Sequence, residues 1–505
     1  MSIPPRGPTP FGWSVLAATV LALLLRLPGI GYHSFWYDEA ESIRLASHPA
    51  MDLATGRVHD NGSPPLFFIL LKPWLSLFGT TEVAARAFAV VMGVAAVPLV
   101  AFVGRRLAGE TAGALAAMLL AFSPFAVELS NEARTYTLTM ALGLADMLFF
   151  LRWRAARRTA DLLAWALLTF LACWSHVFGF VVPLAQSVVV ALFGRRERLL
   201  KGWLTAMSVA GVLWSTWLPT FFVQTATHEP NRGDWIMQFL GTPVALTVGR
   251  SFAWNESPRL LLGLAMALAV GLFAPIALRG LWALRAFPFE ATLLCAWLLV
   301  PSVPLFVVAL FSASHYMARY SSVGLPALLV MLAAGLLSLG EKPRRAALVA
   351  VVAVCSISIV RFATVPLKDD WRGPSSVIVE EARAGEILLF DSDHEVEAFR
   401  YYAVQKGASP PRMVGVKGRP TGDGQLPGRP TGLDGRPAEP STRDWGPDVL
   451  ASEGVWVVLC RPVTPADEWE SWLSARGFRR SAVHHFHHVD VLRFERSPSS
   501  ARSAS

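Results

Sequence analysis

The sequence predicts an all-α domain with many membrane spans, followed by a small soluble α/β domain. Of the 505 residues, 53% are hydrophobic and only 16% are charged, which is too apolar for one ordinary soluble domain. Before residue 365 there are about eleven apolar runs, several of them near the roughly 20 residues that cross a bilayer. After that point, strand-like and helical stretches alternate.

The apolar runs are the candidate spans. Residues 11–29 end without the small-residue cleavage pattern of a signal peptide, so we expect them to remain as the first helix. Residues 66–79 are apolar but short, with Lys72 and Pro73 in the middle, and predict an interfacial or re-entrant helix. The other runs cover residues 83–104, 111–127, 135–151, 161–176, 178–193, 202–222, 258–280, 289–312, 320–340 and 346–364.

Short clusters of Lys and Arg between the spans predict the orientation of the chain. They lie at residues 105–106, 152–158, 195–201, 279–285 and 342–345. The formal net charge of +8 is therefore spread over these loops, not over one face, which argues against a nucleic-acid partner. Clusters of this kind mark cytoplasmic loops. We expect a membrane protein with a cytoplasmic N-terminus and an extracytoplasmic C-terminal domain.

The domain boundary is predicted at residue 364. Residues 365–497 predict a soluble α/β domain, with strands near 386–390 and 455–459. Within it, residues 418–440 are rich in Gly and Pro and predict a flexible insert. The Ser/Ala/Arg tail, residues 498–505, predicts disorder.

An acidic pair, Asp38-Glu39, follows the first apolar run directly. Carboxylates where a membrane helix meets water are costly unless they have a function, although they also suit the N-terminus of the helix that follows. The neighbouring Trp36 and Tyr37 are interface-type aromatic residues and would hold the pair at the level of lipid headgroups. A general base or metal ligand at that depth can meet a substrate carried by a lipid. Asp38 and Glu39 are therefore the candidate catalytic residues.

A second polar stretch places Glu128, Glu132 and Tyr136 about one helical turn apart, with Arg134 between them. The alternative is a solvated loop that contains an internal Glu–Arg pair. On the first interpretation, Glu132, Arg134 and Tyr136 are candidate substrate-binding residues.

A third stretch, residues 314–320, contains His315 and Arg319 directly before a span. Arginine is suited to binding phosphate through its fork of N–H groups, but an interfacial Arg beside Tyr is also a common membrane anchor. Residues 368–373, at the entrance of the outer domain, allow either interpretation. The His-rich tract at 484–488 favours a structural role, because adjacent His side chains in a strand point to opposite faces.

Taken together and in order, these motifs resemble the bacterial glycosyltransferase family 39 proteins. Those proteins are GT-C-fold relatives of protein O-mannosyltransferases and of the lipid A aminoarabinose transferase. The matching stretches are Leu-Arg-Leu-Pro-Gly-Ile-Gly-Tyr-His-Ser-Phe-Trp-Tyr-Asp-Glu-Ala (25–40), Ser-Pro-Pro-Leu-Phe-Phe (63–68), Ser-Pro-Phe (123–125), Ser-Asn-Glu-Ala-Arg-Thr-Tyr (130–136), Ala-Arg-Tyr (318–320) and Asp-Trp-Arg-Gly (370–373).

The resemblance implies transfer of a hexosyl or pentosyl group from a polyprenyl-phosphate-linked donor to a protein, lipid or glycan acceptor outside the cytoplasm. Asp38 matches the essential acidic residue, described as the base for the acceptor or as part of metal and acceptor binding, and Glu39 is its neighbour. Glu132 and Arg134 match the second-loop motif, and Arg319 matches the position expected near the donor phosphate. These roles agree with the chemistry, since a hydroxyl nucleophile needs a base and a phosphate leaving group needs cations.

The chain departs from the family before Pro64-Pro65, where many members have His and this chain has Ser63. The nearest acid is Asp60. A divalent metal ion is the cofactor that the resemblance allows, with Asp38, Asp60 and Glu132 as its candidate ligands. Whether a metal is bound stays open at this point.

Two other functions were weighed. A transporter or flippase for an anionic lipid-linked substrate would place ionisable residues near the bilayer midplane and often shows internal repeats. This sequence shows no repeat between its halves, and Asp146 is the main ionisable residue inside a span. A binding module with a membrane anchor would not need so many spans.

Overall fold

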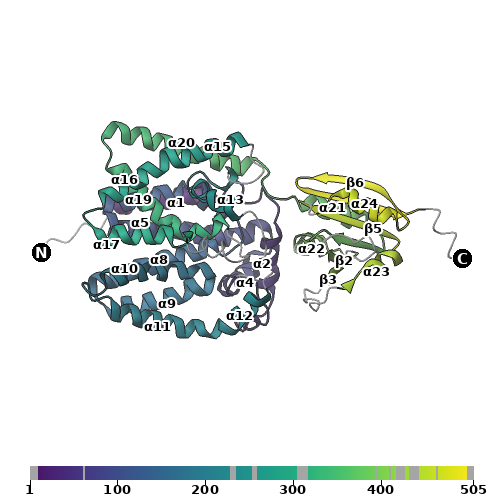
Figure 1. Cartoon of the computed structure of the whole chain (residues 1–505), viewed down its shortest axis with the longest axis horizontal. Helices are drawn as coiled ribbons and strands as arrows, with labels where there is room; N and C mark the ends of the chain where they lie inside the picture. The colour runs from purple at the N-terminus through teal and green to yellow at the C-terminus, as the bar shows by residue number, and fades with distance from the viewer. Residues whose placement is uncertain are drawn as a thin grey trace. The chain divides into compact units, whose positions relative to one another are not determined.

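The structure is a computed structural model and describes residues 9–60, 63–227, 235–252, 259–303, 317–392, 395–408, 411–416, 427–431, 443–461 and 464–497. It divides into two compact units. We call them the helical unit, Met1–Ile30 with Leu45–Val365, and the α/β unit, Gly31–Arg44 with Pro366–Ser505 (Figure 1). Residues 31–44, which the sequence assigns to the membrane domain, thus belong by their contacts to the α/β unit.

The helical unit consists of helices joined by short turns. A further helix, α2 (Tyr37–Ser47), passes from the α/β unit into the helical unit. The helical elements are α1 (Pro10–Arg26), α3 (Ala50–Ala54), α4 (Leu66–Phe78), α5 (Glu82–Ala108), α6 (Glu110–Ala121), α7 (Pro124–Ser130), α8 (Tyr136–Ala156), α9 (Thr159–Ser175), η1 (Val177–Phe180), α10 (Val181–Phe193), α11 (Leu200–Trp214), η2 (Ser215–Trp217), α12 (Leu218–Thr227), α13 (Trp235–Leu240), α14 (Thr242–Thr247), η3 (Arg250–Phe252), α15 (Arg259–Leu268), η4 (Ala269–Phe273), α16 (Ala274–Ala283), α17 (Pro288–Leu299), η5 (Ala318–Gly324), α19 (Leu325–Leu337) and α20 (Glu341–Thr364).

Several of these helices are long and apolar enough to cross a membrane. In the described part of the chain, five helical segments meet both criteria, and a sixth is formed if the bent pair α6–α7 counts as one span. The number of eleven spans is therefore not confirmed. Shorter apolar helices account for part of the difference, and one of them is α4, at the position where the sequence predicts an interfacial or re-entrant helix. The apolar helices agree with a membrane location.

Glycines allow these helices to approach closely. A Cβ atom added to Gly104 of α5 would lie 2.9 Å from the Cα atom of Gly113 in α6. The same holds for Gly280 of α16 and Gly335 of α19, where an added Cβ would clash with the backbone of the other helix. Small residues at helix crossings are typical of membrane bundles. Lipid supplies no hydrophobic force between helices, so close van der Waals packing has to hold them together.

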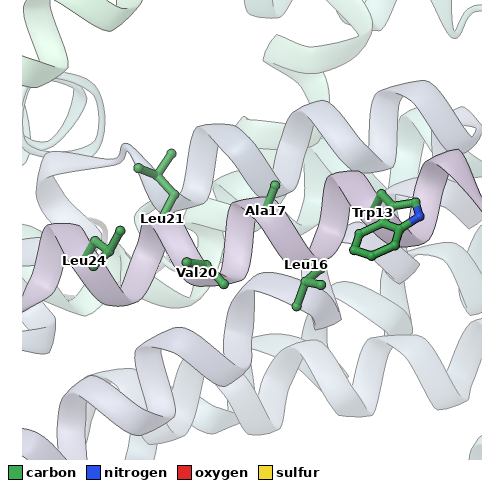
Figure 2. Close-up of a pocket in the computed structure, with 6 residues that line it drawn as sticks. All are labelled: Trp13, Leu16, Ala17, Val20, Leu21 and Leu24. Atoms are coloured by element: carbon green, nitrogen blue, oxygen red, sulfur yellow. The ribbon is translucent and has the colours of Figure 1, made fainter. Parts of the chain in front are cut away.

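The outer surface of α1 carries a groove of about 430 Å³. Its lining is Trp13, Leu16, Ala17, Val20, Leu21 and Leu24 (Figure 2). Because these residues recur at helical spacing along one face, the groove is an apolar stripe, and it includes none of the candidate site residues. A stripe of this kind suits contact with lipid tails.

The α/β unit contains a seven-stranded sheet in the order β4-β3-β2-β1-β5-β7-β6. The central strand β1 is parallel to β2 and β5, and the outer pairs are antiparallel. The strands are β1 (Glu386–Phe390), β2 (Arg412–Val416), β3 (Pro427–Thr431), β4 (Arg443–Asp444), β5 (Gly454–Cys460), β6 (Phe478–Phe486) and β7 (Val489–Arg496). The alternation of strand and helix thus produced the small sheet domain that the sequence predicts.

Helices cover both faces of this sheet because side chains of β1 alternate between two cores. Ile387 and Leu389 face α23 (Gly446–Ala451) and α24 (Ala466–Ser474). Leu388 and Phe390 face α21 (Arg372–Glu381) and α22 (Val396–Gln405), and Ala40 of α2 joins this second core.

The Gly/Pro-rich insert is only partly described. Residues 427–431 form strand β3, antiparallel to β2, so this part of the insert is ordered in the sheet. The rest of the insert and the tail at 498–505 lie outside the described residues.

Candidate functional site

The second polar stretch is buried inside the helical unit. Helix α7 begins after Ser123, whose Oγ accepts a hydrogen bond from the backbone N–H of Ala126 at 3.3 Å, and it bends by 56° from α6. The bend turns the residues that follow into the interior, where Glu132 is 1% exposed and Arg134 is 5% exposed. The solvated-loop alternative is therefore excluded.

Glu128 and Glu132 both bind residues near the start of η3. The Glu132 carboxylate pairs with the Arg250 guanidinium at 2.7 Å. The Glu128 carboxylate accepts the backbone N–H groups of Arg250 at 2.7 Å and Ser251 at 3.1 Å. Carboxylates suit such a position, because the first N–H groups of a helical turn have no partner within it.

Arg250 is a site residue that the sequence did not single out. It lies 118 residues after Glu132, and the only local signal is a single Arg after Gly249 in a polar loop. Sequence spacing carries no information about such a distant pair.

Gly249 provides the turn that lets Glu128 reach these N–H groups. Its φ is +104°, which L side chains rarely adopt, and an added Cβ would lie 2.8 Å from the Glu128 carboxylate. We expect Gly249→Ala to destabilise the protein by about 1–3 kcal/mol, measured as thermal unfolding of the full chain. The matched control is Gly211→Ala in α11, where an added Cβ meets none of the described residues within 4 Å; equal destabilisation in both variants would contradict the role of Gly249.

Arg134 pairs with Asp60, and their side-chain atoms are 2.9 Å apart. Burial favours the neutral form of Asp60, but the charge and hydrogen bond of Arg134 outweigh it and hold the pKa of Asp60 below its usual range. Asp60 is thus ionised at neutral pH and neutralises Arg134.

An aromatic cluster surrounds Arg319. Its guanidinium lies 5.7 Å from the centre of the Tyr136 ring, a cation–π distance. The Tyr136 ring lies 5.8 Å from His176, and the Phe178 ring stacks on Tyr320 at 4.3 Å. Arg319 is itself buried, which is unlike a simple interfacial anchor.

His176 follows α9 directly, outside the helices on either side of it. Burial disfavours a charge on the imidazole of His176, and the positive charges of Arg134 and Arg319 act in the same direction. The imidazole is therefore neutral at physiological pH. The sequence did not single out this residue, because a lone His between two apolar runs has no distinctive pattern.

His315, a metal site and Asp146 are the other features that the sequence singled out. His315 lies outside the described residues. The described part of the chain holds no group of three or more His, Cys, Asp or Glu side chains arranged for a metal. Asp146 is buried in α8 and accepts hydrogen bonds from Thr169 and Gln186, which gives this intramembrane carboxylate a structural role in joining helices.

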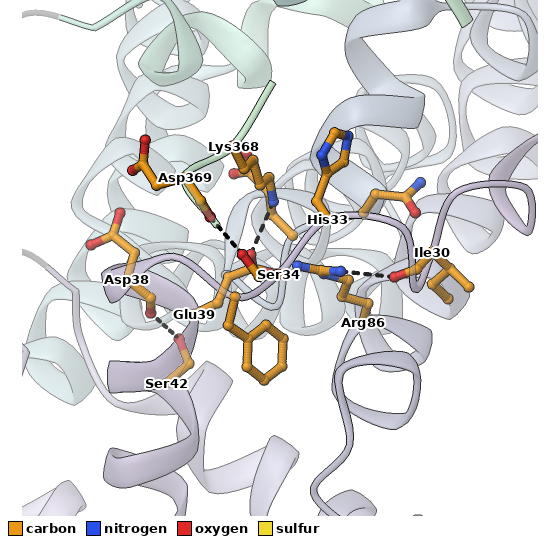
Figure 3. Close-up of polar contacts among 12 residues, drawn as sticks. Ile30, His33, Ser34, Asp38, Glu39, Ser42, Arg86, Lys368 and Asp369 are labelled. Atoms are coloured by element: carbon orange, nitrogen blue, oxygen red, sulfur yellow. Dashed lines mark hydrogen bonds and ion pairs between the residues drawn. The ribbon is translucent and has the colours of Figure 1, made fainter. Parts of the chain in front are cut away.

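The acidic pair belongs to the α/β unit, in the first turn of α2. Glu39 is fully buried and pairs with Lys368 at 2.9 Å. Asp38 is partly exposed, and Figure 3 shows its carboxylate on a different side of the helix from the Glu39–Lys368 pair. Both carboxylates lie at a helix N-terminus as the capping alternative expects, but only Asp38 remains accessible for chemistry.

Residues 368–373 hold the loop that precedes Asp38. The Arg372 guanidinium donates hydrogen bonds to the carbonyl groups of Gly31, Tyr32 and His33 at 2.8 to 3.1 Å. Ser34 Oγ donates to the Asp369 carbonyl at 2.5 Å and accepts the Trp371 N–H at 3.1 Å. These hydrogen bonds tie residues 368–373 to the loop before the acidic pair.

The His-rich tract supports the same segment. It forms the end of β6 and the turn into β7, and the backbone N–H of Asp370 donates to the His487 carbonyl at 3.0 Å. His488 Nδ1 lies 3.2 Å from the Asp369 carboxylate. These contacts favour the structural interpretation of the tract.

We expect Arg372→Ala to destabilise the loop at residues 31–36 by about 1.5–3 kcal/mol, the usual value of hydrogen bonds to a charged group. Limited proteolysis of that loop in the full chain measures the effect. Arg383→Ala is the control, because the Arg383 side chain is 71% exposed and lies 3.9 Å from its acidic partner; equal loop cleavage in the two variants would speak against positioning by Arg372.

Comparison with known proteins shows which solved structures share this fold. The fold is that of ArnT from Cupriavidus metallidurans in its apo state, with a TM-score of 0.63 and 16% identity over 95% of this chain and 98% of that chain. The same enzyme bound to undecaprenyl phosphate matches with a TM-score of 0.60 and 15% identity, over 96% and 98%. AglB, the oligosaccharyltransferase from Archaeoglobus fulgidus, matches with a TM-score of 0.50 and 13% identity, over 77% and 63%.

The chain thus has the architecture of the GT-C membrane glycosyltransferases. Its residues 62–220 match the sequence model of the dolichyl-phosphate-mannose-protein mannosyltransferase family. The fold and this match are therefore what the chain shares with these glycosyltransferases. No match is found among curated protein sequences.

Proposed function

We propose that the protein transfers a sugar from a polyprenyl-phosphate-linked donor to a hydroxyl group of a protein, lipid or glycan acceptor. The similar structures support this class of donor, because one holds undecaprenyl phosphate and another holds dolichol-phosphate with an inhibitory peptide. The reaction would take place on the extracytoplasmic side of the bacterial inner membrane.

The observation that carries the proposal is the burial of Arg134, Arg250 and Arg319 in the apolar helical unit. A buried arginine is costly unless it meets an anion, and its planar fork suits phosphate. Arg134 and Arg250 meet carboxylates at 2.9 and 2.7 Å, and Arg319 faces the Tyr136 ring. These contacts hold the arginine side chains in place. The arginines could then bind a phosphate group that enters from the membrane.

The proposed roles follow from the bonds that change. The acceptor O–H attacks the anomeric carbon of the sugar, and Asp38 takes the proton. The bond between that carbon and the phosphate oxygen breaks, and the electron pair stays on the phosphate. Arg134 and Arg319 stabilise the charge that develops there. Glu132 and Glu39 act indirectly, through the Arg250 and Lys368 side chains that they bind.

A divalent metal ion fits the residues poorly as the structure places them. Asp60 and Glu132 are candidate ligands, but each carboxylate faces an arginine. We therefore assign no step to a metal, and the test below includes added Mg²⁺ or Mn²⁺ and a chelator.

The deciding experiment incubates the purified full chain with a panel of radiolabelled polyprenyl-phosphate sugars and a membrane extract. Glycosyl transfer predicts that one donor loses its label to an acceptor and leaves polyprenyl phosphate. A transporter or flippase predicts that the intact lipid-linked sugar crosses the bilayer of a reconstituted vesicle. Movement of the label without any new glycosidic product would refute the enzyme and support the transporter.

A further inference from the structure

His176 carries a polar group whose purpose the fold does not explain. The residue has an extended backbone, with φ −161° and ψ 149°, between α9 and η1. Its Nδ1 atom accepts a hydrogen bond from the backbone N–H of Phe178 at 3.1 Å. An acceptor nitrogen carries no proton, so the proton of the neutral ring lies on Nε2. Nδ1 thus accepts a hydrogen bond within the local turn, and Nε2 carries the N–H that can act as a donor.

The Nε2–H group makes no hydrogen bond to any described residue. The side chain is nevertheless buried, with 5% of its surface exposed. Its ring stacks on Phe178 at 4.8 Å and lies 5.8 Å from Tyr136, so packing holds its orientation. A donor in a side chain that is almost entirely buried has little access to water, and a ligand with an acceptor oxygen would supply the hydrogen bond that it lacks.

The electrostatic surroundings of His176 indicate the charge of that ligand. The positive charges of Arg134 and Arg319 both act on the ring and disfavour a further positive charge there, and the Asp60 carboxylate acts in the opposite direction. Two arginines and one carboxylate leave a net positive charge beside a neutral N–H donor, which is a setting for an anion with several acceptor oxygens. A neutral imidazole adds a hydrogen bond here without adding repulsion between cations.

We propose that His176 binds the lipid-linked donor by donating its Nε2–H to an oxygen of the donor phosphate, beside Arg134 and Arg319. The inference rests on the proposed function and adds a substrate-binding residue to it. The hydrogen bond strengthens as the sugar–phosphate bond breaks, because the phosphate keeps the electron pair of that bond. His176 keeps its proton throughout.

Two substitutions separate this role from a purely structural one. In His176→Asn, the amide oxygen can replace Nδ1 as the acceptor for the Phe178 N–H, but nothing replaces Nε2–H. In His176→Gln, the longer side chain carries an N–H group to about the position of Nε2. A structural role predicts that Asn is the better replacement, whereas a phosphate-binding role predicts that Gln is.

The experiment measures the Kd of undecaprenyl phosphate, and separately of inorganic phosphate, for the full chain in lipid nanodiscs. We expect His176→Asn to bind undecaprenyl phosphate about 10- to 100-fold more weakly, as for the loss of one hydrogen bond to a charged group, and His176→Gln to stay within about three-fold of wild type. His485→Asn is the matched control, because that His side chain is 75% exposed in the α/β unit.

Each result bears on the proposal. The proposal would be overturned if wild type and His176→Asn bound undecaprenyl phosphate with equal affinity. It would also be overturned if His176→Gln, at unchanged Tm, lost as much affinity as His176→Asn. A change confined to inorganic phosphate would overturn the assignment to a lipid-linked phosphate. A wild-type protein that binds no polyprenyl phosphate would instead remove the proposed function itself. Imidazole ¹⁵N NMR of the wild type keeps the test decisive if a variant fails to fold, since the Nε2–H signal of His176 has to shift on adding undecaprenyl phosphate.

Discussion

Asp38→Asn is expected to lower the rate of sugar transfer by about 10²–10⁴-fold, the usual contribution of a general base. Asparagine has nearly the same shape as aspartate but cannot take the proton of the acceptor hydroxyl. The hydrogen bond that Ser42 Oγ donates to the backbone carbonyl of Asp38 does not depend on the substituted side chain. Transfer from a radiolabelled polyprenyl-phosphate sugar gives the rate, and thermal unfolding tests the fold.

The control for Asp38 lies on the same helix. Glu41 is another carboxylate of α2, and it pairs with Arg44 at 2.6 Å. Glu41→Gln removes a charge near Asp38 and should leave transfer within about two-fold, because the pair is partly exposed to solvent. Full activity of Asp38→Asn would contradict the role of Asp38 as the base. Equal losses in both variants would show that the helix needs its charge, not a specific base.

The second large effect concerns the buried pair Glu39–Lys368. Neither side chain is more than 4% exposed, so removal of one partner leaves a buried charge without its counter-ion. We expect Glu39→Gln or Lys368→Met each to reduce the free energy of unfolding by about 3–5 kcal/mol. The double variant should be more stable than the sum of the single variants predicts, because it leaves no unpaired charge.

Unfolding of the full chain in detergent, followed for the two single variants and the double variant, measures this coupling. The control pair is Lys406 with Glu380, which are 3.2 Å apart and 38% and 69% exposed. A pair so exposed contributes about 0–1 kcal/mol. Additive effects of Glu39→Gln and Lys368→Met would show that the two charges do not depend on each other, and the role of the pair in positioning the Asp38 loop would be lost.

Local patterns were sufficient for much of the architecture. Strands β1 and β5 could be predicted from their short apolar runs, because such a run depends on residues close together in the sequence. The membrane location followed from the apolar runs for the same reason. The number of spans was less accessible, since bends such as the one between α6 and α7 arise from packing and not from composition.

The candidate site was only partly accessible from the sequence. Glu132 and Arg134 stood out through their spacing, but their partners Arg250 and Asp60 did not. His176 was missed because its significance depends on burial and on the charges around it. Glu39 was predicted beside Asp38 as a supporting acid; its buried partner Lys368 is 329 residues away, and no local pattern predicts such a pair.

The sequence by itself predicted an apolar, multi-span domain and a small α/β domain, and its acidic and basic motifs resemble those of family 39 glycosyltransferases. Apolar runs and ordered motifs support these predictions, because both can be recognised from the residues of the sequence without knowledge of the fold. Only the tertiary structure decided which of these polar groups face each other: Glu39 with Lys368, Glu132 with Arg250, and Asp38 on an accessible side of its helix. The physical reason is that the energy of a charge depends on burial and on its nearest counter-ion, and both are set when distant parts of the chain pack together.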